Sequence, residues 1–399
     1  MSEHPASSVT LPSGLPDVDA ASAAHGEQVA RHLREQILDS PQGQLPFDVW
    51  MDHALYAPGL GYYAAGSAKL GTDFTTAPEL TSLFGQTLSR QVADILEACQ
   101  ATPAILEFGA GTGALAEGIL QGLEAHGLHP QYFIIEVSPD LRHRQQQRLA
   151  PFAGRVEWLD QLPTHFQGCV LANEVLDAMP VKLFCFAQDH DNGPDAGAPP
   201  ALLECMVGLT PDLQFTWQTR PADALLEKAL AHRMPGLPGY QSEVNLRAEA
   251  WIREMGSWLN EGAALLIDYG FPQREYYHPQ RSQGTLMCHF RHHSHGEPLV
   301  LPGLQDITAH VDFTAMADAA LDGGLNVLGY TSQAHFLINA GIMDRLASSK
   351  PSPGDLSAVQ KLLSEAEMGE LFKVMAIGTN LDMAYPLRGF SRHDRRHRL

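Results

Sequence analysis

The chain of 399 residues is long enough to bury a large core, and its 44% hydrophobic and 18% charged residues are typical of a globular protein. Its net charge of -20 repels nucleic acids and anionic membranes at long range, so a nucleic-acid substrate is disfavoured. No apolar run approaches the roughly 18 residues of a membrane span, and we expect none. The five cysteines form no C-x-x-C pair, which favours reduced thiols in the cytoplasm.

The first hundred residues predict a helical region preceded by a disordered tail. Residues 1–25 are rich in Ala, Ser, Pro and Asp, a composition typical of disorder. Apolar spacing then predicts amphipathic helices over residues 26–38 and 46–56. We therefore expect an N-terminal helical or cap region over residues 26–100.

A loop rich in Gly and Thr follows over residues 71–79. Glu79 comes three residues after Thr76, which predicts a capping box for a helix from Pro78 to about Ala98. Capping accounts for these two side chains but not for the density of Gly and Thr. A role of this loop in covering a ligand therefore stays open beside the capping role.

Residues 105–113, with the sequence Ile-Leu-Glu-Phe-Gly-Ala-Gly-Thr-Gly, carry the strongest signal in the chain. An apolar strand, alternating glycines and then a helical period predict the opening of a nucleotide-binding α/β sheet. Glycines let the backbone turn sharply and approach a ligand closely. The next apolar run ends at Glu136, where such a sheet places a carboxylate that binds ribose.

Further apolar runs predict the rest of an α/β fold with a Rossmann-like, seven-stranded sheet. Besides the strands before Glu107 and Glu136, strands are expected over residues 156–159, 168–172, 263–267, 325–329 and 371–378. Three short strands over residues 181–186, 202–207 and 213–218 interrupt the alternation of strands and helices. They predict an inserted antiparallel β meander.

Polar residues follow the fourth strand, at the edge of the sheet where ligands bind. Asn173, Glu174 and Asp177 lie there within a few residues of one another. Helix capping and the helix dipole would account for Asn173 and Asp177, but they leave Glu174 without a role. We therefore predict that this segment is functional.

Two other segments are interpreted without a specific function. The histidine-rich tract over residues 288–295 suggests a metal site, but it has no pair at i, i+4 in a clear helix and no acidic ligand. We therefore expect no metal. Residues 386–399 are rich in Arg and predict a solvated basic tail.

The glycine turn is compatible with two classes of enzyme. Gly109, Gly111 and Ala114, with Glu136 downstream, also fit an NAD(P)-dependent oxidoreductase. The pattern acid-x-Gly-x-Gly-x-Gly from Glu107, without a second mononucleotide-binding half, favours instead an S-adenosylmethionine-dependent methyltransferase. A non-catalytic nucleotide-binding assembly factor is a third alternative, because a sequence cannot demonstrate turnover.

Seven multi-residue motifs are distributed over most of the chain. They are Leu55-Tyr56-x-Pro58-Gly59-x-Gly61-Tyr62-Tyr63, Asp73-Phe74-x-Thr76-Ala77-Pro78-Glu79, Glu107-x-Gly109-x-Gly111-x-Gly113, Glu136-Val137-Ser138-Pro139, Asn173-Glu174-x-x-Asp177-Ala178-x-Pro180-Val181, Asp268-Tyr269-Gly270 and Asp306-Ile307-Thr308-Ala309-His310-Val311-Asp312-Phe313. Through these motifs the chain resembles the MidA-like methyltransferases. That family includes the mitochondrial complex I assembly factor that methylates an arginine of a core complex I subunit.

The resemblance implies a class I methyltransferase that uses S-adenosyl-L-methionine and acts on a protein, with arginine as the expected target and a complex I subunit as one expected substrate. The expected cofactor-binding residues are Glu107, Gly109, Gly111, Gly113, Glu136, Asp160 and Asn173, with Glu136 on the ribose and Asp160 facing the adenine. The expected catalytic residues are Glu174, Asp177, His310 and Asp312. A structural helix cap is an equal alternative for His310 and Asp312.

These expectations divide the chain into six parts. Between the disordered tail with its helical cap region and the basic tail, residues 101–180 and 241–385 form the nucleotide-binding domain, and residues 181–240 form an inserted β/α substrate region. The N-terminal sequence does not have the Arg-rich face of a mitochondrial presequence, so we expect a bacterial-type, cytoplasmic member. The oligomeric state stays open, with a homodimer as one alternative.

Overall fold

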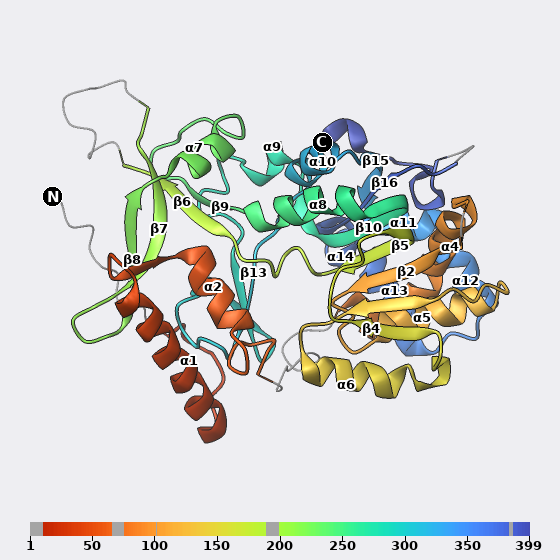
Figure 1. Ribbon diagram of the computed structural model, residues 1–399, viewed down its shortest axis with the longest axis horizontal. Helices are drawn as coiled ribbons and strands as arrows, with labels where there is room; N and C mark the ends of the chain where they lie inside the picture. The colour runs from red at the N-terminus through yellow and green to blue at the C-terminus, as the bar shows by residue number, and fades with distance from the viewer. Residues whose placement is uncertain (1–10, 66–75, 101, 189–198, 383–385) are drawn as a thin grey trace.

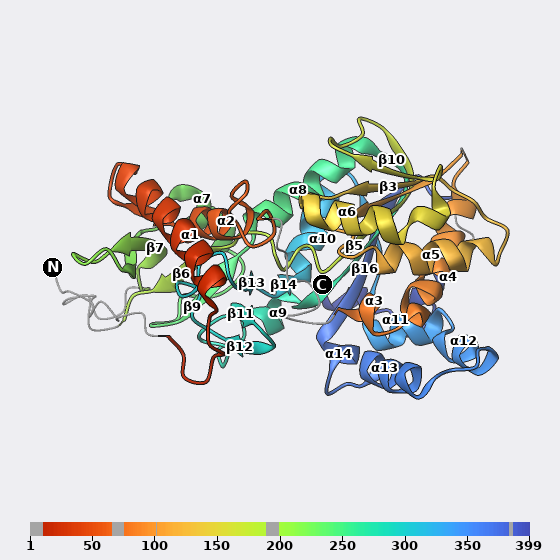
Figure 2. The same cartoon turned by 90° about the horizontal axis from the view of Figure 1, so that it is seen from below.

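The computed structural model describes residues 11–65, 76–100, 102–188, 199–382 and 386–399. The first part of the loop expected over residues 71–79 therefore lies outside the described residues, as do residues 1–10 of the expected tail. Figures 1 and 2 show two regions side by side, a large sheet covered by helices and a smaller β region that carries the N-terminal helices. No helix in the described part of the chain is long and apolar enough to cross a membrane.

The large sheet is mixed, and within the described residues it contains eight strands. Seven run in the order β15-β16-β10-β5-β2-β3-β4, and β14 pairs with β10 in addition. Strands β2 to β5 and β10 are parallel, whereas β16 is antiparallel to both neighbours. The strands are β2 (Ala104–Phe108), β3 (Tyr132–Ile135), β4 (Val156–Leu159), β5 (Phe166–Asn173), β10 (Leu259–Phe271), β14 (Val311–Asp312), β15 (Asn326–Ser332) and β16 (Phe372–Thr379). The expected count of seven missed β14, because β10 continues beyond Ile267 and pairs there with Val311.

Strand β10 shows why the sheet is stable, since both of its faces are buried. Ala263, Leu265 and Ile267 pack into one hydrophobic core, and Ala264 and Leu266 pack into the other. Successive side chains of a strand point to opposite faces, so a strand covered on both sides is a continuous apolar run. The first core includes helices α4 (Ser82–Ala98), α5 (Ala114–Glu124), α11 (Gln333–Asn339) and α13 (Pro353–Leu363), and the second includes α8 (Leu246–Trp258) and α10 (Phe313–Asp322).

The smaller region is built around the predicted meander. Its five-stranded sheet has the order β1-β7-β6-β9, and β8 pairs with β7. Val29, Leu33 and Trp50 of the N-terminal helices pack against Val207 of this sheet in one core. The N-terminal helices and the insertion therefore form one packed region, which the sequence analysis had treated separately. Its elements are α1 (Ala20–Asp39), β1 (Gln44–Pro46), α2 (Phe47–Tyr56), β6 (Lys182–Phe186), β7 (Leu202–Leu209), β8 (Phe215–Pro221), α7 (Ala224–Leu230) and β9 (Gln241–Val244).

The remaining elements are short connections around these two regions. They are α3 (Ala77–Leu80), α6 (Pro139–Arg148), α9 (Gln273–Tyr276), β11 (Met287–Phe290), β12 (His293–His295), β13 (Asp306–Thr308), α12 (Ile342–Ser348), α14 (Met368–Leu371) and the 3-10 helices η1 (Ala150–Phe152), η3 (Arg388–Phe390) and η4 (Arg396–Arg398). The histidine-rich tract forms the hairpin of β11 and β12. Among the described residues no group of three potential ligands could hold a metal ion.

Two predictions about the N-terminal part are wrong in detail. Helix α1 begins at Ala20, because Asp19 caps it by accepting a hydrogen bond from the backbone N–H of Ser22, so the expected tail does not extend to residue 25. The capping box at Thr76 does not form, and the helix expected from Pro78 is interrupted where Thr81 caps α4 instead.

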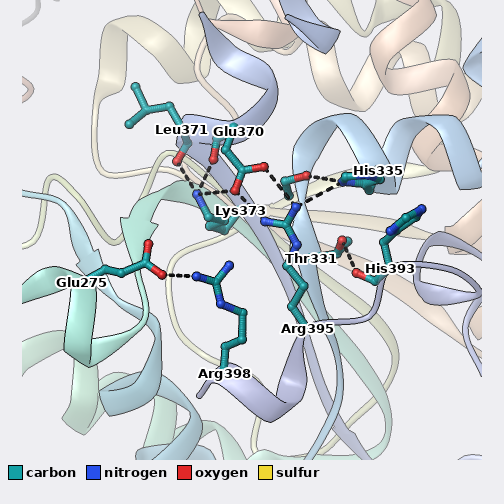
Figure 3. A network of polar contacts seen from close by, with 10 residues as sticks. Glu275, Thr331, His335, Glu370, Leu371, Lys373, His393, Arg395 and Arg398 are labelled. Carbon is teal, nitrogen blue, oxygen red and sulfur yellow. Dashed lines mark hydrogen bonds and ion pairs between the residues drawn. The ribbon is translucent and has the colours of Figure 1, made fainter. Parts of the chain in front are cut away.

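The C-terminal segment, predicted to be a solvated basic tail, has four exposed arginines of five but also makes specific contacts with the fold. Figure 3 shows Arg395 in an ion pair with Glu370 at 2.5 Å and Arg398 in contact with Glu275. Lys373, in the same network, donates to the backbone carbonyl oxygen of Leu371 at 3.2 Å. Arg395 and Arg398 pair with carboxylates of the fold, and Leu387 and Phe390 are buried in the first core, so the C-terminal segment packs against the rest of the protein.

Candidate active site

A cavity of about 310 Å³ opens at the carboxyl ends of β2, β3 and β5. It is lined by the glycine turn, by the residues after β3 and β5, by the end of α2 and by the start of α3. Thr76, Asn173 and Asp306 come from three of the sequence motifs, and all three line this cavity. The carboxyl edge of a parallel sheet is the usual place for a ligand.

The glycine turn has the left-handed backbone that its sequence predicts. The φ angles of Gly109, Gly111 and Gly113 are 60°, 54° and 85°, which L side chains rarely adopt. A Cβ on Gly109 would lie 3.3 Å from Cγ2 of Val175, whereas a Cβ on Gly111 would meet no heavy atom within 4 Å. Because Gly111 also lines the cavity, the absence of its side chain keeps space open for a ligand.

Glu107, at the end of β2, is a buried acid with one neutral partner. Its side chain is 2% exposed, and the hydroxyl of Tyr132 donates to its Oε2 at 2.7 Å. Burial raises the pKa of Glu107 to about 8, and the hydrogen bond from Tyr132 opposes that rise. Glu107 therefore lines the cavity as an acceptor whose negative charge would be stabilised by a cationic group.

Glu136 is held by a network that the sequence analysis missed. The backbone N–H of Ser138 donates to one carboxylate oxygen at 2.9 Å, and Nε2 of Gln145 donates to the other at 2.8 Å. The same Nε2 donates to the carbonyl oxygen of Gly111 at 2.8 Å, and Nε1 of Trp158 donates to Oε1 of Gln145. Gln145 thus joins the glycine turn to the expected ribose carboxylate. The polar surface of α6 gave no signal that this one Gln is buried.

Glu79 closes the outer side of the glycine turn. Its carboxylate accepts hydrogen bonds from the hydroxyl of Thr112 and from Arg148, the latter at 3.1 Å. This side chain was expected to cap a helix, and it instead connects α3 to the glycine turn. The ligand-covering alternative for this loop is consistent with that position.

The segment after β5 turns into the cavity at Glu174. The φ angle of Glu174 is 53°, a strained value for a residue with a side chain, and its backbone N–H donates to the carbonyl oxygen of Ile267. Nδ2 of Asn173 donates to Oε1 of Glu174 at 3.1 Å. Burial raises the pKa of Glu174 to about 8, and the negative charge of Asp268 adds to the rise.

Asp177 is the acid of the site that has a carboxylate oxygen without a hydrogen-bond partner in the described part of the chain. It is 4% exposed, and its Oδ1 has no hydrogen-bond partner among the described residues. Burial raises its pKa well above the usual value, and the charges of Asp268, Glu174 and Asp306 raise it further. A buried carboxylate oxygen without a partner is costly, so this position favours a ligand that donates N–H groups and carries positive charge.

Two tyrosines from the end of α2 and the following turn form the wall opposite these acids. The rings of Tyr56 and Tyr63 stack with centroids 5.5 Å apart and an interplanar angle of 19°. The hydroxyl of Tyr56 donates to the carbonyl oxygen of Ala178 at 2.9 Å, and that of Tyr63 donates to Oδ1 of Asp306 at 2.8 Å. Sequence analysis included both tyrosines in a motif but gave them no role.

Four predicted site residues do not line the cavity, namely Gly113, Asp160, His310 and Asp312. The side chain of Asp160 is 80% exposed and forms an ion pair with Arg142 at 2.6 Å. The ring of His310 stacks on Phe271 at 5.3 Å, and burial lowers its pKa to about 4. Asp312 accepts hydrogen bonds from the backbone N–H groups at the start of α10, so its geometry is that of the helix cap.

Comparison with known proteins identifies the family of the chain and the cofactor of that family. Residues 87–331 match the sequence profile of a family described as S-adenosyl-L-methionine-dependent methyltransferase, and this segment contains the glycine turn, Glu136 and Glu174. The chain belongs to this methyltransferase family. The expected family, activity and cofactor are thereby confirmed, and the oxidoreductase and binding-module alternatives are not favoured.

Relatives of this methyltransferase extend over almost the whole chain. A protein from Burkholderia thailandensis, crystallised with S-adenosylhomocysteine, is 46% identical, with a TM-score of 0.88 over 97% of this chain and 100% of its own. The protein arginine methyltransferase NDUFAF7 of Danio rerio, a mitochondrial protein, is 27% identical over 90% of this chain and 88% of its own. Its Drosophila melanogaster homolog is 27% identical over 93% and 90%.

Proposed function

We propose that this methyltransferase transfers a methyl group to an arginine side chain of a protein. The observation that carries the proposal is the unpartnered, buried Oδ1 of Asp177, a residue that lines the same cavity as Glu174 and Asp306. The names of the curated relatives, which are protein arginine methyltransferases, support an arginine acceptor. A complex I subunit, which the family resemblance implies, remains the proposed substrate.

The residues on the sheet side of the cavity fit the cofactor. We infer that Glu107 and the turn from Gly109 to Gly113 surround its methionine part, where a buried acid and open space beside Gly111 suit the ammonium group of an amino-acid tail. Glu136 would accept hydrogen bonds from the ribose hydroxyls. Asn173, which lines the cavity, and Asp160, which follows β4 outside it, remain proposed contacts, the latter to the adenine.

Guanidinium chemistry matches the other side of the cavity. An arginine side chain keeps its charge in proteins and presents up to five N–H donors in one plane. Glu174 and Asp177 can hold two of these donors, and the unpartnered oxygen of Asp177 gains the partner that it lacks. The ring faces of Tyr56 and Tyr63 suit a planar cation, which stacks favourably on aromatic rings.

The same carboxylates account for the proton that must leave. S-adenosylmethionine supplies a methyl carbon already activated by its bond to a sulfonium sulfur. The residues of the chain therefore mainly align an in-line displacement. The guanidinium nitrogen that forms the new bond to carbon must lose one proton. Glu174 or Asp177 can accept it, because their raised pKa values make them stronger bases than ordinary carboxylates.

We also infer the division of labour between the two regions. The strand path from β15 to β4 would correspond to the class I methyltransferase sheet, formed by residues 101–180 and 241–385. The inserted residues 181–240, packed with the N-terminal helices, would form the substrate-facing region. Tyr56 at the end of α2 and Asp306 at β13 link that region to the cavity.

The test is labelled methyl transfer into protein. The purified enzyme is incubated with S-adenosylmethionine that carries a tritiated methyl group and with an extract of cells lacking the gene. Labelled protein is then hydrolysed to amino acids. We expect the label in methylated arginine, and peptide mapping then identifies the acceptor. Label found only in methylated lysine or in small molecules would overturn the proposal.

A further inference from the structure

Strand β10 places a buried carboxylate directly behind the turn that carries the proposed acceptor-binding acids. Asp268 is 1% exposed. Its Oδ2 accepts hydrogen bonds from the backbone N–H of Leu176 at 3.0 Å and of Asp177 at 3.2 Å, while Oδ1 accepts from the N–H of Tyr269 at 2.8 Å. Three backbone donors therefore converge on one side chain.

These hydrogen bonds follow from the way in which β5 leaves the sheet. Asn173 still pairs with Ile267 of β10, and the left-handed Glu174 then turns the chain away. Beyond the turn, the N–H groups of Leu176 and Asp177 are no longer part of the sheet ladder and need other acceptors. Asp268 supplies an acceptor from the neighbouring strand, so it fixes the backbone from which the Asp177 side chain projects.

The charges around Asp268 are mostly of the same sign. Its charge adds to the rise that burial causes in the pKa of both Glu174 and Asp177. Burial also raises the pKa of the Tyr269 hydroxyl, and the charges of Glu174, Asp177 and Asp268 raise it further. The one cation placed opposite Asp268 in the register is Lys373 of β16. Its ammonium group donates to the carbonyl oxygens of Glu370 and Leu371.

We propose that Asp268 is a positioning residue, which fixes the turn after β5 and so directs Glu174 and Asp177 towards the acceptor. The proposal rests on the proposed role of those two acids in binding the acceptor. Asp268 acts through hydrogen bonds to the turn and through its charge, and it is buried behind the turn rather than in contact with substrate.

The test is the pH dependence of methyl transfer by Asp268→Asn. Initial rates of labelled methyl incorporation into the same extract are measured from pH 6 to pH 9.5 with saturating cofactor. Loss of the negative charge should move the midpoint of the rise in rate by about one unit to lower pH. Loss of one backbone anchor should also lower the plateau rate by about tenfold.

Two further variants distinguish the effect of the negative charge of Asp268 from the effect of changing a buried side chain. Asp268→Glu retains the charge, so it should keep the wild-type midpoint even where its plateau rate is low. Glu243→Gln is the matched control, because Glu243 is equally buried at 1% exposure and accepts hydrogen bonds from Tyr276 and Thr285. It should keep the wild-type midpoint. Binding of S-adenosylhomocysteine, measured by titration calorimetry, should change less than about twofold in Asp268→Asn, since its charge is not at the cofactor side.

A wild-type midpoint in Asp268→Asn would overturn the proposal and would leave only a structural role. If that variant does not fold, Asp268→Ser removes the same charge and is judged by the same shift. The proposed function fails by a different result, namely label found only in methylated lysine or in small molecules. The two failures are therefore distinguishable.

Discussion

The proposed cofactor side and the proposed acceptor side of the cavity differ in the groups that surround their carboxylates. On the cofactor side, Glu107 and Glu136 each accept hydrogen bonds from neutral donors, Tyr132 for the first and Gln145 for the second. On the acceptor side, Glu174 and Asp177 face other acids, and one oxygen of Asp177 lacks a partner. On the cofactor side, these donors oppose the rise in the pKa of Glu107 and Glu136 that burial causes. On the acceptor side, the neighbouring acids raise the pKa of Asp177 further, and a cation would relieve that excess of negative charge.

The two sides also differ in how the chain assembles them. Residues 107–145 supply the glycine turn, Glu136 and Gln145 through consecutive strands and helices. The acceptor side combines Tyr56 after α2, the segment after β5 and Asp306 of β13, which are far apart in the sequence. The proposed cofactor-binding residues therefore come from neighbouring segments of the chain. The proposed acceptor-binding residues are brought together only when the smaller region packs against the large sheet.

The largest effect should come from removing one charge on the acceptor side. We expect Glu174→Gln to lower the rate of methyl transfer by about 100-fold or more, because the amide neither attracts a guanidinium nor accepts its proton. Its affinity for S-adenosylhomocysteine, measured by calorimetry, should stay at the wild-type value. Glu107→Gln is the opposite control and should weaken that affinity. Equal effects of both variants on cofactor affinity would break the comparison.

Substitution in the glycine turn should weaken the binding of the cofactor. Gly111→Ala places a methyl group in the cavity at a φ angle of 54°, and we expect a loss of cofactor affinity of about tenfold or more. Gly127 is the matched control, because its φ angle is 73° and a Cβ there would also meet no atom within 4 Å. Gly127→Ala should show a similar loss of thermal stability without the loss of affinity. Unchanged affinity in Gly111→Ala would contradict the assignment of the cofactor side.

The rate of the wild-type enzyme should rise with pH through the neutral range. The pKa of Glu174 is about 8 and that of Asp177 is also raised, so both acids are protonated at low pH and ionise as the pH increases. An arginine acceptor stays cationic throughout, so ionisation only strengthens its binding, and we expect about a tenfold rise from pH 6.5 to pH 8. Initial rates with saturating cofactor measure this. A rate that falls over this interval would argue against ionised carboxylates as the acceptor-binding groups.

The smallest effect on cofactor binding should come from substitution of Gln145. This side chain is neutral and supports Glu136 and the glycine turn through hydrogen bonds alone. Gln145→Ala removes the hydrogen bonds to Glu136 and Gly111, and we expect about threefold weaker binding of S-adenosylhomocysteine and a loss of about 1–3 kcal/mol in the free energy of unfolding. Gln91→Ala, at an equally buried Gln that accepts from the N–H of Gly389, should lose stability alone. Equal cofactor affinity in both variants would remove Gln145 from the site.

Sequence reasoning located the segments that carry local signals. The glycine turn, the strand end at Glu136 and the acids after β5 lie around one cavity, because each follows a parallel strand and all such strands end at one edge. Asp160 also follows a strand, yet it pairs with Arg142 at the surface. A strand end therefore predicts the edge of the sheet but not the direction of a side chain.

The amino-acid sequence by itself determined the family, the cofactor and the α/β class of the fold. These depend on short-range patterns of glycines, acids and apolar runs. Only the tertiary structure decided that Gln145 joins the glycine turn to Glu136, that Tyr56 and Tyr63 face the acids, and that Asp268 lies behind Asp177. The reason is physical. Burial and hydrogen-bond partners come from segments distant in the chain, and they set the charge and direction of each side chain in the site.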